Sequence, residues 1–155
     1  MRKLITLCLV TAILSWGGQA SAQSVDMSPQ AKLAIQQARQ DCQSFENGTL
    51  KLGENVVSRV DITGDGQLDE VVDFGKLSCS TAASLFCGTG GCSLSVITAG
   101  KATEFLAKAW NVFVWDNQPI LMLVVHGSEC GGINLRRCYR ATVWTEKGFS
   151  TVGGL

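Results

Sequence analysis

Six cysteines constrain this chain more than any other feature of its sequence. All six lie in the 133 residues that follow residue 22 of the 155-residue chain, and the seventh, Cys8, lies before them. An even number of cysteines in an exported chain of this size is typical of a disulfide framework. We therefore expect the fold to be held by disulfide bonds.

The amino-terminal segment is the reason for expecting export. Arg2 and Lys3 precede an apolar run over residues 4–16, and three small residues follow at 20–22. This order is typical of a secretory signal peptide. We predict that residues 1–22 are a signal peptide and that it is removed after Ala22.

The remaining residues, 23–155, are predicted to form one disulfide-bonded, β-rich domain, because their number suits a single domain and no low-complexity linker divides them. Without Arg2 and Lys3 the chain carries 11 basic and 13 acidic side chains, a net charge of −2. No broad basic face favours nucleic acid as a partner. The signal's apolar run is too short to span a bilayer, so we expect no membrane insertion after cleavage and a periplasmic or secreted location.

The six cysteines allow fifteen pairings, and the sequence alone does not decide among them. Short separations favour two pairs and leave a third: Cys87 with Cys92, Cys130 with Cys138, and Cys42 with Cys79. Redox-active pairs usually have two residues between the cysteines, whereas Cys87 and Cys92 have four. A zinc site is disfavoured because His126 is the only histidine. Structural disulfides are the favoured interpretation.

Oxygen-bearing side chains alternate around two glycines in residues 61–69. They are Asp61, Thr63, Asp65, Gln67 and Asp69. Calcium prefers six to eight oxygen ligands, and glycines permit the tight bend that turns them toward one point. We therefore predict a structural Ca²⁺ site. The alternative is an acidic turn that binds nothing, since Asp and Gly also favour turns, but five acidic side chains within residues 61–73, with no base among them, favour a cation.

The flanks of this loop differ from those of an EF-hand. An EF-hand has helices on both sides and a glutamate at position twelve of the loop, which is Val72 here. Residues 56–60 and 70–74 are instead rich in valine and are predicted to be strands.

Residues 56–74 resemble the calcium loop of FG-GAP and VCBS-type repeats, in which a D-x-D/N-x-D-G-x-x-D run joins two strands of a propeller blade. The resemblance implies that Asp61, Asp65 and Asp69 bind the metal, together with the main-chain oxygen of Gln67. Thr63 replaces the usual Asp or Asn, which implies a weaker site. The sequence has no second copy of the run, so a propeller is not implied. The whole chain otherwise looks like a small exported bacterial protein.

A helix is predicted from Ser28-Pro29 to between Cys42 and Phe45, because serine caps helices and proline suits their first position. Its imperfect apolar stripe consists of Leu33, Ile35, Ala38 and Cys42. The helix is therefore expected to cover one face of a sheet.

Short apolar runs separated by turn residues predict an antiparallel meander. The runs are residues 93–98, 110–115, 120–126, 138–144 and 149–152, whereas residues 80–86 and 102–108 are ambiguous. Residues 120–125 are apolar throughout, which predicts a central strand covered on both faces, with the helix as the cover. The predicted fold class is α+β, mainly β, with an antiparallel meander sheet and an amino-terminal helix packed on it.

Two glycine-rich loops bounded by cysteines, residues 88–91 and 128–134, are candidate contact surfaces because disulfides make loops rigid. A basic cluster near the second loop would either balance the charge of the acidic hairpin or suit an acidic partner. It consists of Arg136, Arg137 and Arg140. We expect a non-enzymatic binding domain whose partner is an unknown protein or envelope component, a class that includes inhibitors.

A small periplasmic hydrolase that uses His126 and a nearby carboxylate is the alternative. The only local candidates for such a site are His126, Ser128 and Glu129, which can share one face of a strand end. They lie outside any recognised nucleophile motif, so a structural role is favoured and no catalytic residue is predicted.

Overall fold

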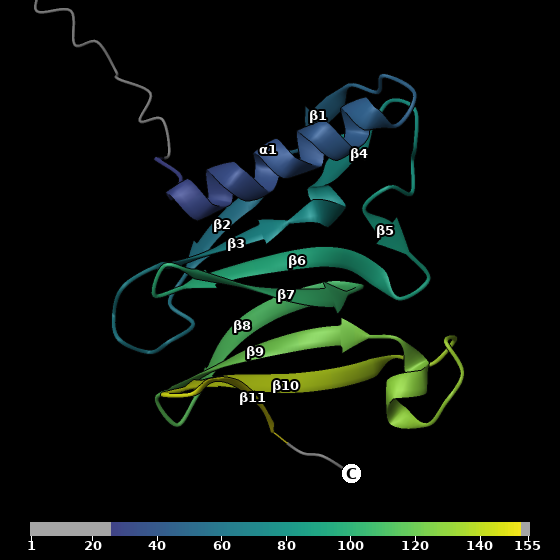
Figure 1. Ribbon diagram of the computed structural model, residues 1–155. Helices are drawn as coiled ribbons and strands as arrows, with labels where there is room; N and C mark the ends of the chain where they lie inside the picture. Colours follow the sequence, from purple (N-terminus) through teal and green to yellow (C-terminus); the bar gives the residue numbers. More distant parts are fainter. Residues whose placement is uncertain (1–25, 153–155) are drawn as a thin grey trace, which may run out of the picture.

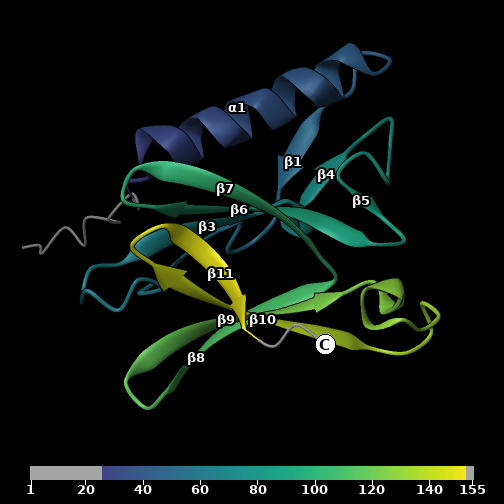
Figure 2. The ribbon, with the colours of Figure 1, turned by 60° about the horizontal axis from the view of Figure 1, so that its bottom comes forward.

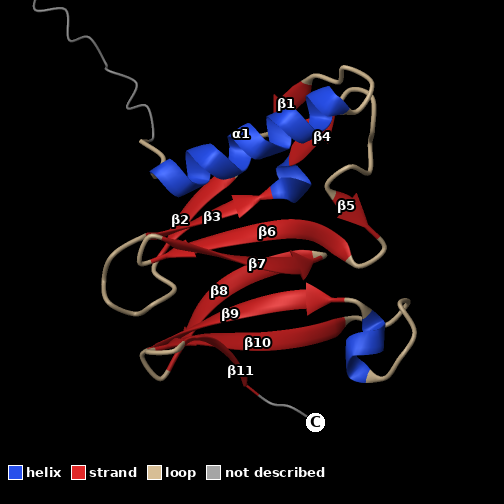
Figure 3. Ribbon diagram, in the orientation of Figure 1, coloured by secondary structure: helices blue, strands red, loops and turns tan. Residues whose placement is uncertain are grey.

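A computed structural model describes residues 26–152, and the predicted signal peptide lies outside this range. Strands dominate the fold (Figure 3). The elements of the first half are α1 (Pro29–Ser44), β1 (Leu50–Leu52), β2 (Val57–Val60), β3 (Asp69–Asp73), η1 (Phe74–Lys76), β4 (Leu77–Cys79) and β5 (Cys87–Gly88). Those of the second half are β6 (Gly91–Thr98), β7 (Lys101–Ala107), β8 (Ala109–Trp115), β9 (Gln118–Val125), η2 (Gly127–Cys130), β10 (Cys138–Thr145) and β11 (Gly148–Val152). Within this range, no helix is long and apolar enough to span a membrane.

The helix begins and ends where the sequence predicts. The Ser28 side chain accepts a hydrogen bond from the Ala31 amide at 3.1 Å, and Phe45 follows the last helical residue. The predicted apolar stripe is wrong for Leu33, which is 64% exposed. Because each residue turns the helix by about 100°, Leu33 lies roughly 200° from the buried Ile35 and so faces water.

The helix packs on the first of two main sheets, which we call the helix-side sheet (Figure 1). Its strand order is β2-β3-β6-β5, and β7 pairs with the opposite edge of β6. All pairs are antiparallel. The contact between helix and sheet is apolar and buried, and its central residues are Ala31, Ile35, Val72 and Ile97.

The second sheet has the order β11-β10-β9-β8 and stacks against the opposite face of the helix-side sheet (Figure 1). The main core lies between the two sheets, and its largest buried side chains are Ile62, Val71, Leu94, Val96, Leu121, Leu123 and Val125. The chain passes from one sheet to the other at Lys108, the only residue between β7 and β8, whose amide donates to the Val124 carbonyl at 2.7 Å.

The apolar strand β9 is covered on one face only. Leu121, Leu123 and Val125 are buried in the core, but Met122 and Val124 point to the outer face of the second sheet and stay half-buried. Within residues 26–152, no element covers that outer face (Figures 1 and 2). The prediction that the helix covers this strand is therefore wrong, because the helix lies on the other sheet.

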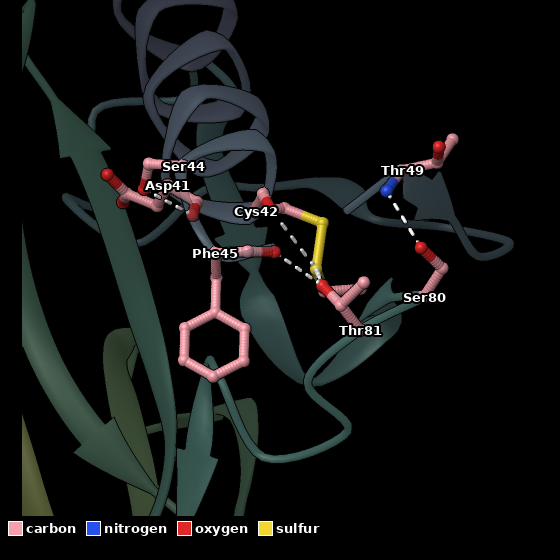
Figure 4. Close-up of a disulfide and its surroundings, with 8 residues drawn as sticks. Asp41, Cys42, Ser44, Phe45, Thr49, Ser80 and Thr81 are labelled. Atoms are coloured by element: carbon pink, nitrogen blue, oxygen red, sulfur yellow. Dashed lines mark hydrogen bonds between the residues drawn. A yellow bond between two sulfur atoms is a disulfide. The ribbon is translucent and has the colours of Figure 1, made fainter. Parts of the chain in front are cut away.

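Three disulfides join the cysteines in the predicted pairs. Cys42–Cys79 ties α1 to β4, Cys87–Cys92 links β5 to β6, and Cys130–Cys138 closes the loop before β10. Around the first of these, the Thr81 hydroxyl donates to the Phe45 carbonyl at 2.7 Å (Figure 4). Disulfides indicate that the protein works in an oxidising environment outside the cytoplasm.

The predicted fold class is confirmed, since residues 26–152 are mainly antiparallel β with one α-helix packed on a sheet and three disulfides. The ambiguous residues 102–108 belong to strand β7, which ends at Ala107. Residues 80–86 form turns instead of a regular element. The sequence predicts one meander sheet, whereas the strands form two stacked main sheets and a small two-stranded sheet of β1 and β4.

Candidate functional sites

The acidic loop, residues 61–69, connects β2 to β3, as the strand-loop-strand prediction requires. Gly64 and Gly66 have φ angles of +79° and +81°. Residues other than glycine rarely adopt this left-handed backbone conformation, so the two glycines allow the chain to turn tightly here. The loop runs close to the β8–β9 turn, since a side chain added at Gly64 would lie 3.1 Å from Pro119.

The loop's carboxylates accept hydrogen bonds from its own amides. Asp61 accepts from the amides of Gly64 at 2.6 Å and Gly66 at 2.9 Å. One oxygen of Asp69 accepts from the amides of Ile62 at 2.9 Å and Thr63 at 3.0 Å. The carboxylates therefore shape the loop from inside.

Asp65 and Gln67 lie on the exposed part of the loop, where one oxygen of Asp65 accepts from the Gln67 amide at 2.8 Å. The Thr63 hydroxyl lies 3.5 Å from Asp61. Within residues 26–152, no three His, Cys, Asp or Glu side chains come together as a ligand group. A carboxylate has about four lone-pair positions. The hydrogen bonds from the loop amides occupy one oxygen of Asp65 and one of Asp69, so the other oxygen of each carboxylate is left for a hard cation such as calcium. The calcium site stays a prediction.

Two acidic residues that the sequence groups with this loop have other roles. Glu70 is buried, with a side chain 8% exposed; it accepts from the Ser28 amide with both oxygens at 3.1 and 3.0 Å and pairs with Arg59 at 3.1 Å. Asp73 accepts from the Trp110 indole at 3.1 Å. Their charge is therefore not directed at the loop, and fewer carboxylates remain to attract a cation there than the sequence implies.

The two cysteine-bounded loops meet at one end of the molecule. The Asn134 side-chain amide donates to the Thr89 carbonyl at 3.0 Å, and Lys108 donates to the Asn134 side-chain oxygen. Strand β5 and helix η2 accordingly lie on the same side in Figure 1. We call residues 88–91 and 131–137 together the bridged-loop surface. The sequence predicts each loop separately but not their contact.

The second of these loops folds back tightly on η2. The Gly132 amide donates to the Gly127 carbonyl at 3.0 Å, and a side chain added at Gly127 would lie 2.0 Å from the Ile133 carbonyl oxygen. Only glycine therefore permits this close approach. Despite this close packing, Ile133 is 65% exposed and Leu135 is 90% exposed. The fold thus displays two apolar side chains on an ordered, disulfide-closed loop.

The candidate catalytic trio divides into two separate local contacts. His126 Nδ1 lies 2.7 Å from the Ser128 hydroxyl and accepts from the Ser128 amide at 3.2 Å, so the imidazole caps η2. Glu129 instead pairs with Arg140. The serine and histidine are close enough for a nucleophile and a base, but the Glu129 carboxylate is engaged by the arginine. The same ion pair removes Arg140 from the basic cluster and leaves Arg136 and Arg137 exposed.

Comparison with known proteins identifies no relative that shares the acidic loop or the bridged-loop surface. The resemblance of residues 56–74 to the calcium loop of FG-GAP and VCBS-type repeats therefore stays a prediction. No protein-family model matches the chain, and no match was found among curated proteins or solved structures.

Proposed function

We propose that the protein is an exported, non-enzymatic binding domain that presents the bridged-loop surface to an acidic protein or envelope component. The observation that carries this proposal is the exposure of Leu135 and Ile133, at 90% and 65%, on a loop closed by a disulfide. Exposed apolar side chains on an ordered loop are typical of a contact site, since they gain free energy when a partner removes them from water.

The charge and rigidity of this surface support the same proposal. Arg136 and Arg137 are exposed beside Leu135 and favour a partner with acidic groups. The disulfide Cys130–Cys138 and the Asn134 contact with Thr89 hold the loop before binding. A loop that is already ordered loses less conformational entropy on association.

Calcium in the acidic loop is proposed as a structural ion that supports the fold rather than the contact. With about 1 mM free calcium and a dissociation constant of about 10⁻⁴ M, binding adds about 1.4 kcal/mol to the free energy of unfolding. The disulfides and the predicted signal peptide support the proposal that the protein acts in the periplasm or outside the cell.

The binding proposal is tested by co-sedimentation of the oxidised protein with isolated bacterial envelope fractions. We expect the double variant Ile133→Ser, Leu135→Ser to reduce binding at least about tenfold, because it removes the apolar contact. The matched control is Leu68→Ser, since Leu68 is also 65% exposed but lies on the acidic loop. Equal binding by the parent and the double variant would contradict the proposal.

The calcium proposal is tested by calorimetric titration. We expect the parent to bind with a dissociation constant of about 10⁻⁴ to 10⁻³ M, and Asp65→Ala to lose the calcium heat. Glu54→Ala is the control, because Glu54 is an exposed turn residue that precedes β2, at the other end of that strand from the acidic loop. Indistinguishable traces from the parent and Asp65→Ala would remove calcium from the proposal.

A small periplasmic hydrolase that uses His126 and the nearby Glu129 is the second candidate function. It is favoured by one observation, the 2.7 Å separation of His126 Nδ1 from the Ser128 hydroxyl. A panel of ester and peptide substrates separates the two functions. The binding proposal predicts no turnover, whereas turnover that is abolished by His126→Ala and Ser128→Ala would establish the hydrolase.

A further inference from the structure

The outer face of the second sheet, which we call the open face, is apolar. Its large side chains are Phe113, Trp115, Ile120, Met122, Val124, Tyr139 and Val143, which the strand register places on one side of β8, β9 and β10. Trp115 is 71% exposed, Tyr139 is 54% exposed, Phe113 is 38% exposed, and the other four are half-buried. No element within residues 26–152 lies over this face (Figure 2).

The open face also lacks charge. The register places four residues each from β8, β9 and β10 on it, and none of these twelve is Asp, Glu, Lys, Arg or His. A strand that is apolar on both faces, as β9 is, is typical of a sheet that is covered on both sides. Large exposed apolar patches on soluble proteins usually mark an interaction surface.

The chain's own helix is not available as the missing cover. Helix α1 is tied to β4 by Cys42–Cys79, and the Ser28 amide at its start is bound by Glu70 of β3. The first contact holds the end of the helix to the small two-stranded sheet of β1 and β4, and the second holds its start to the helix-side sheet. Both keep the helix on the far side of the core from the open face (Figure 1).

We propose that a second copy of this chain covers the open face, so that two molecules associate sheet to sheet about a two-fold axis. A two-fold interface brings the same patch of both copies together, so any charge near its centre would face its own copy. A face without charges avoids this repulsion and offers no ion pair that would select a different partner.

The size of the open face suits such a dimer. Four strands about 4.8 Å apart and up to eight residues long, at about 3.4 Å per residue, cover about 500 Å². Two copies would bury about 1,000 Å² in total, which is near the lower limit for a specific interface. We therefore expect a dissociation constant in the micromolar range. Sheets that pack in this way lie about 10 Å apart, as in β-sandwiches.

Sedimentation equilibrium of the oxidised protein tests the proposal. The parent is expected to be a dimer at about 100 μM. Met122→Glu places a charge at the middle of the central strand β9 and is expected to raise the dimer dissociation constant at least about 100-fold, because two like charges would be buried together. Leu33→Glu is the matched control, since Leu33 is 64% exposed on α1, away from the open face. It should leave the dimer intact.

A mixing experiment distinguishes a broken interface from a damaged fold. Met122→Glu and Met122→Lys should each be monomeric, but a mixture of the two should form dimers, because opposite charges then meet across the axis. A parent that is monomeric at 100 μM, a Met122→Glu variant that dimerises like the parent, or a mixture that stays monomeric would each overturn the proposal. None of these outcomes depends on the bridged-loop surface, so the proposed binding function is tested separately.

Discussion

The two sheets of this protein share one core but differ on their outer faces. The outer face of the helix-side sheet is closed by α1, where Ile35 packs on Val72 and Ile97. The outer face of the second sheet carries a comparable apolar surface, with Met122 at its centre, and is left open. An apolar sheet face therefore favours burial, but it does not determine which element covers it. Here the position of the helix is decided by contacts at its two ends, the Cys42–Cys79 disulfide and the Ser28–Glu70 hydrogen bonds.

The strongest test of this comparison removes the disulfide that holds the cover. Cys42→Ala with Cys79→Ala should lower the free energy of unfolding by about 4 kcal/mol, because the bond closes a long loop in the unfolded chain. Cys87→Ala with Cys92→Ala should cost about 2 kcal/mol, since that loop is short. Urea denaturation measures both values. If deleting Cys42–Cys79 lowered the free energy of unfolding less than deleting Cys87–Cys92, the stabilising role given to the Cys42–Cys79 disulfide would be contradicted.

The two faces of strand β9 provide the next test. Leu123→Ala should lower the free energy of unfolding by about 3 kcal/mol, because it leaves a cavity in the core. Met122→Ala, one residue away on the open face, should cost less than about 1 kcal/mol when measured at concentrations that keep the protein monomeric. Similar losses for both variants would show that the open face is buried within the single chain.

Glu70 gives a smaller test at the other end of the helix, where it binds the Ser28 amide. Glu70→Gln should cost about 1–2 kcal/mol, because it removes a charge-assisted bond to the Ser28 amide and leaves Arg59 without its partner. Thermal and urea unfolding measure the change. Glu104→Gln is the control, since Glu104 is exposed on the same sheet. An equal effect of the two substitutions would remove Glu70 from the contacts that hold the helix.

The smallest effect concerns Asp26, two residues before the helix cap Ser28. The Lys32 ammonium donates to Asp26 at 3.0 Å and holds the pKa of that carboxyl below its ordinary value of 3.8, with a minor contribution from Arg59. Because the folded pKa is lowered, the stabilisation is present above pH 3.8 and is lost as the pH falls through the folded value. We expect Lys32→Gln to raise the pKa of Asp26 toward 3.8 in an NMR titration. An unchanged pKa would show that the pair does not persist in solution.

Local signals made much of the fold predictable from the sequence. Ser28 and Pro29 marked the helix start, and alternation between apolar runs and turns located most strands. Short separations identified the disulfide pairs. The ion pair of Arg59 with Glu70 was also within reach, since the two residues face each other once the hairpin around the acidic loop is in register.

The remaining features depend on contacts between residues far apart in the sequence. Periodicity shows that residues 120–125 are apolar, but it does not show which sheet the helix selects. Asn134 and Thr89 are 45 residues apart, and neither carries a pattern that predicts their bond. The acidic loop was located correctly on a hairpin, whereas the amides that its carboxylates bind could not be assigned without the loop's backbone geometry.

The passage from β7 to β8 through Lys108 affects how the molecule comes apart. One continuous ribbon contributes an edge to each sheet, and its hydrogen bonds lie on both sides of the junction, to β6 before it and to β9 after it. Separating the layers would strain both sets of bonds at once. We therefore expect the two sheets to unfold as a single cooperative unit rather than as halves joined by a hinge, and we expect proteolysis to detect no intermediate in which one layer is released while the other stays folded.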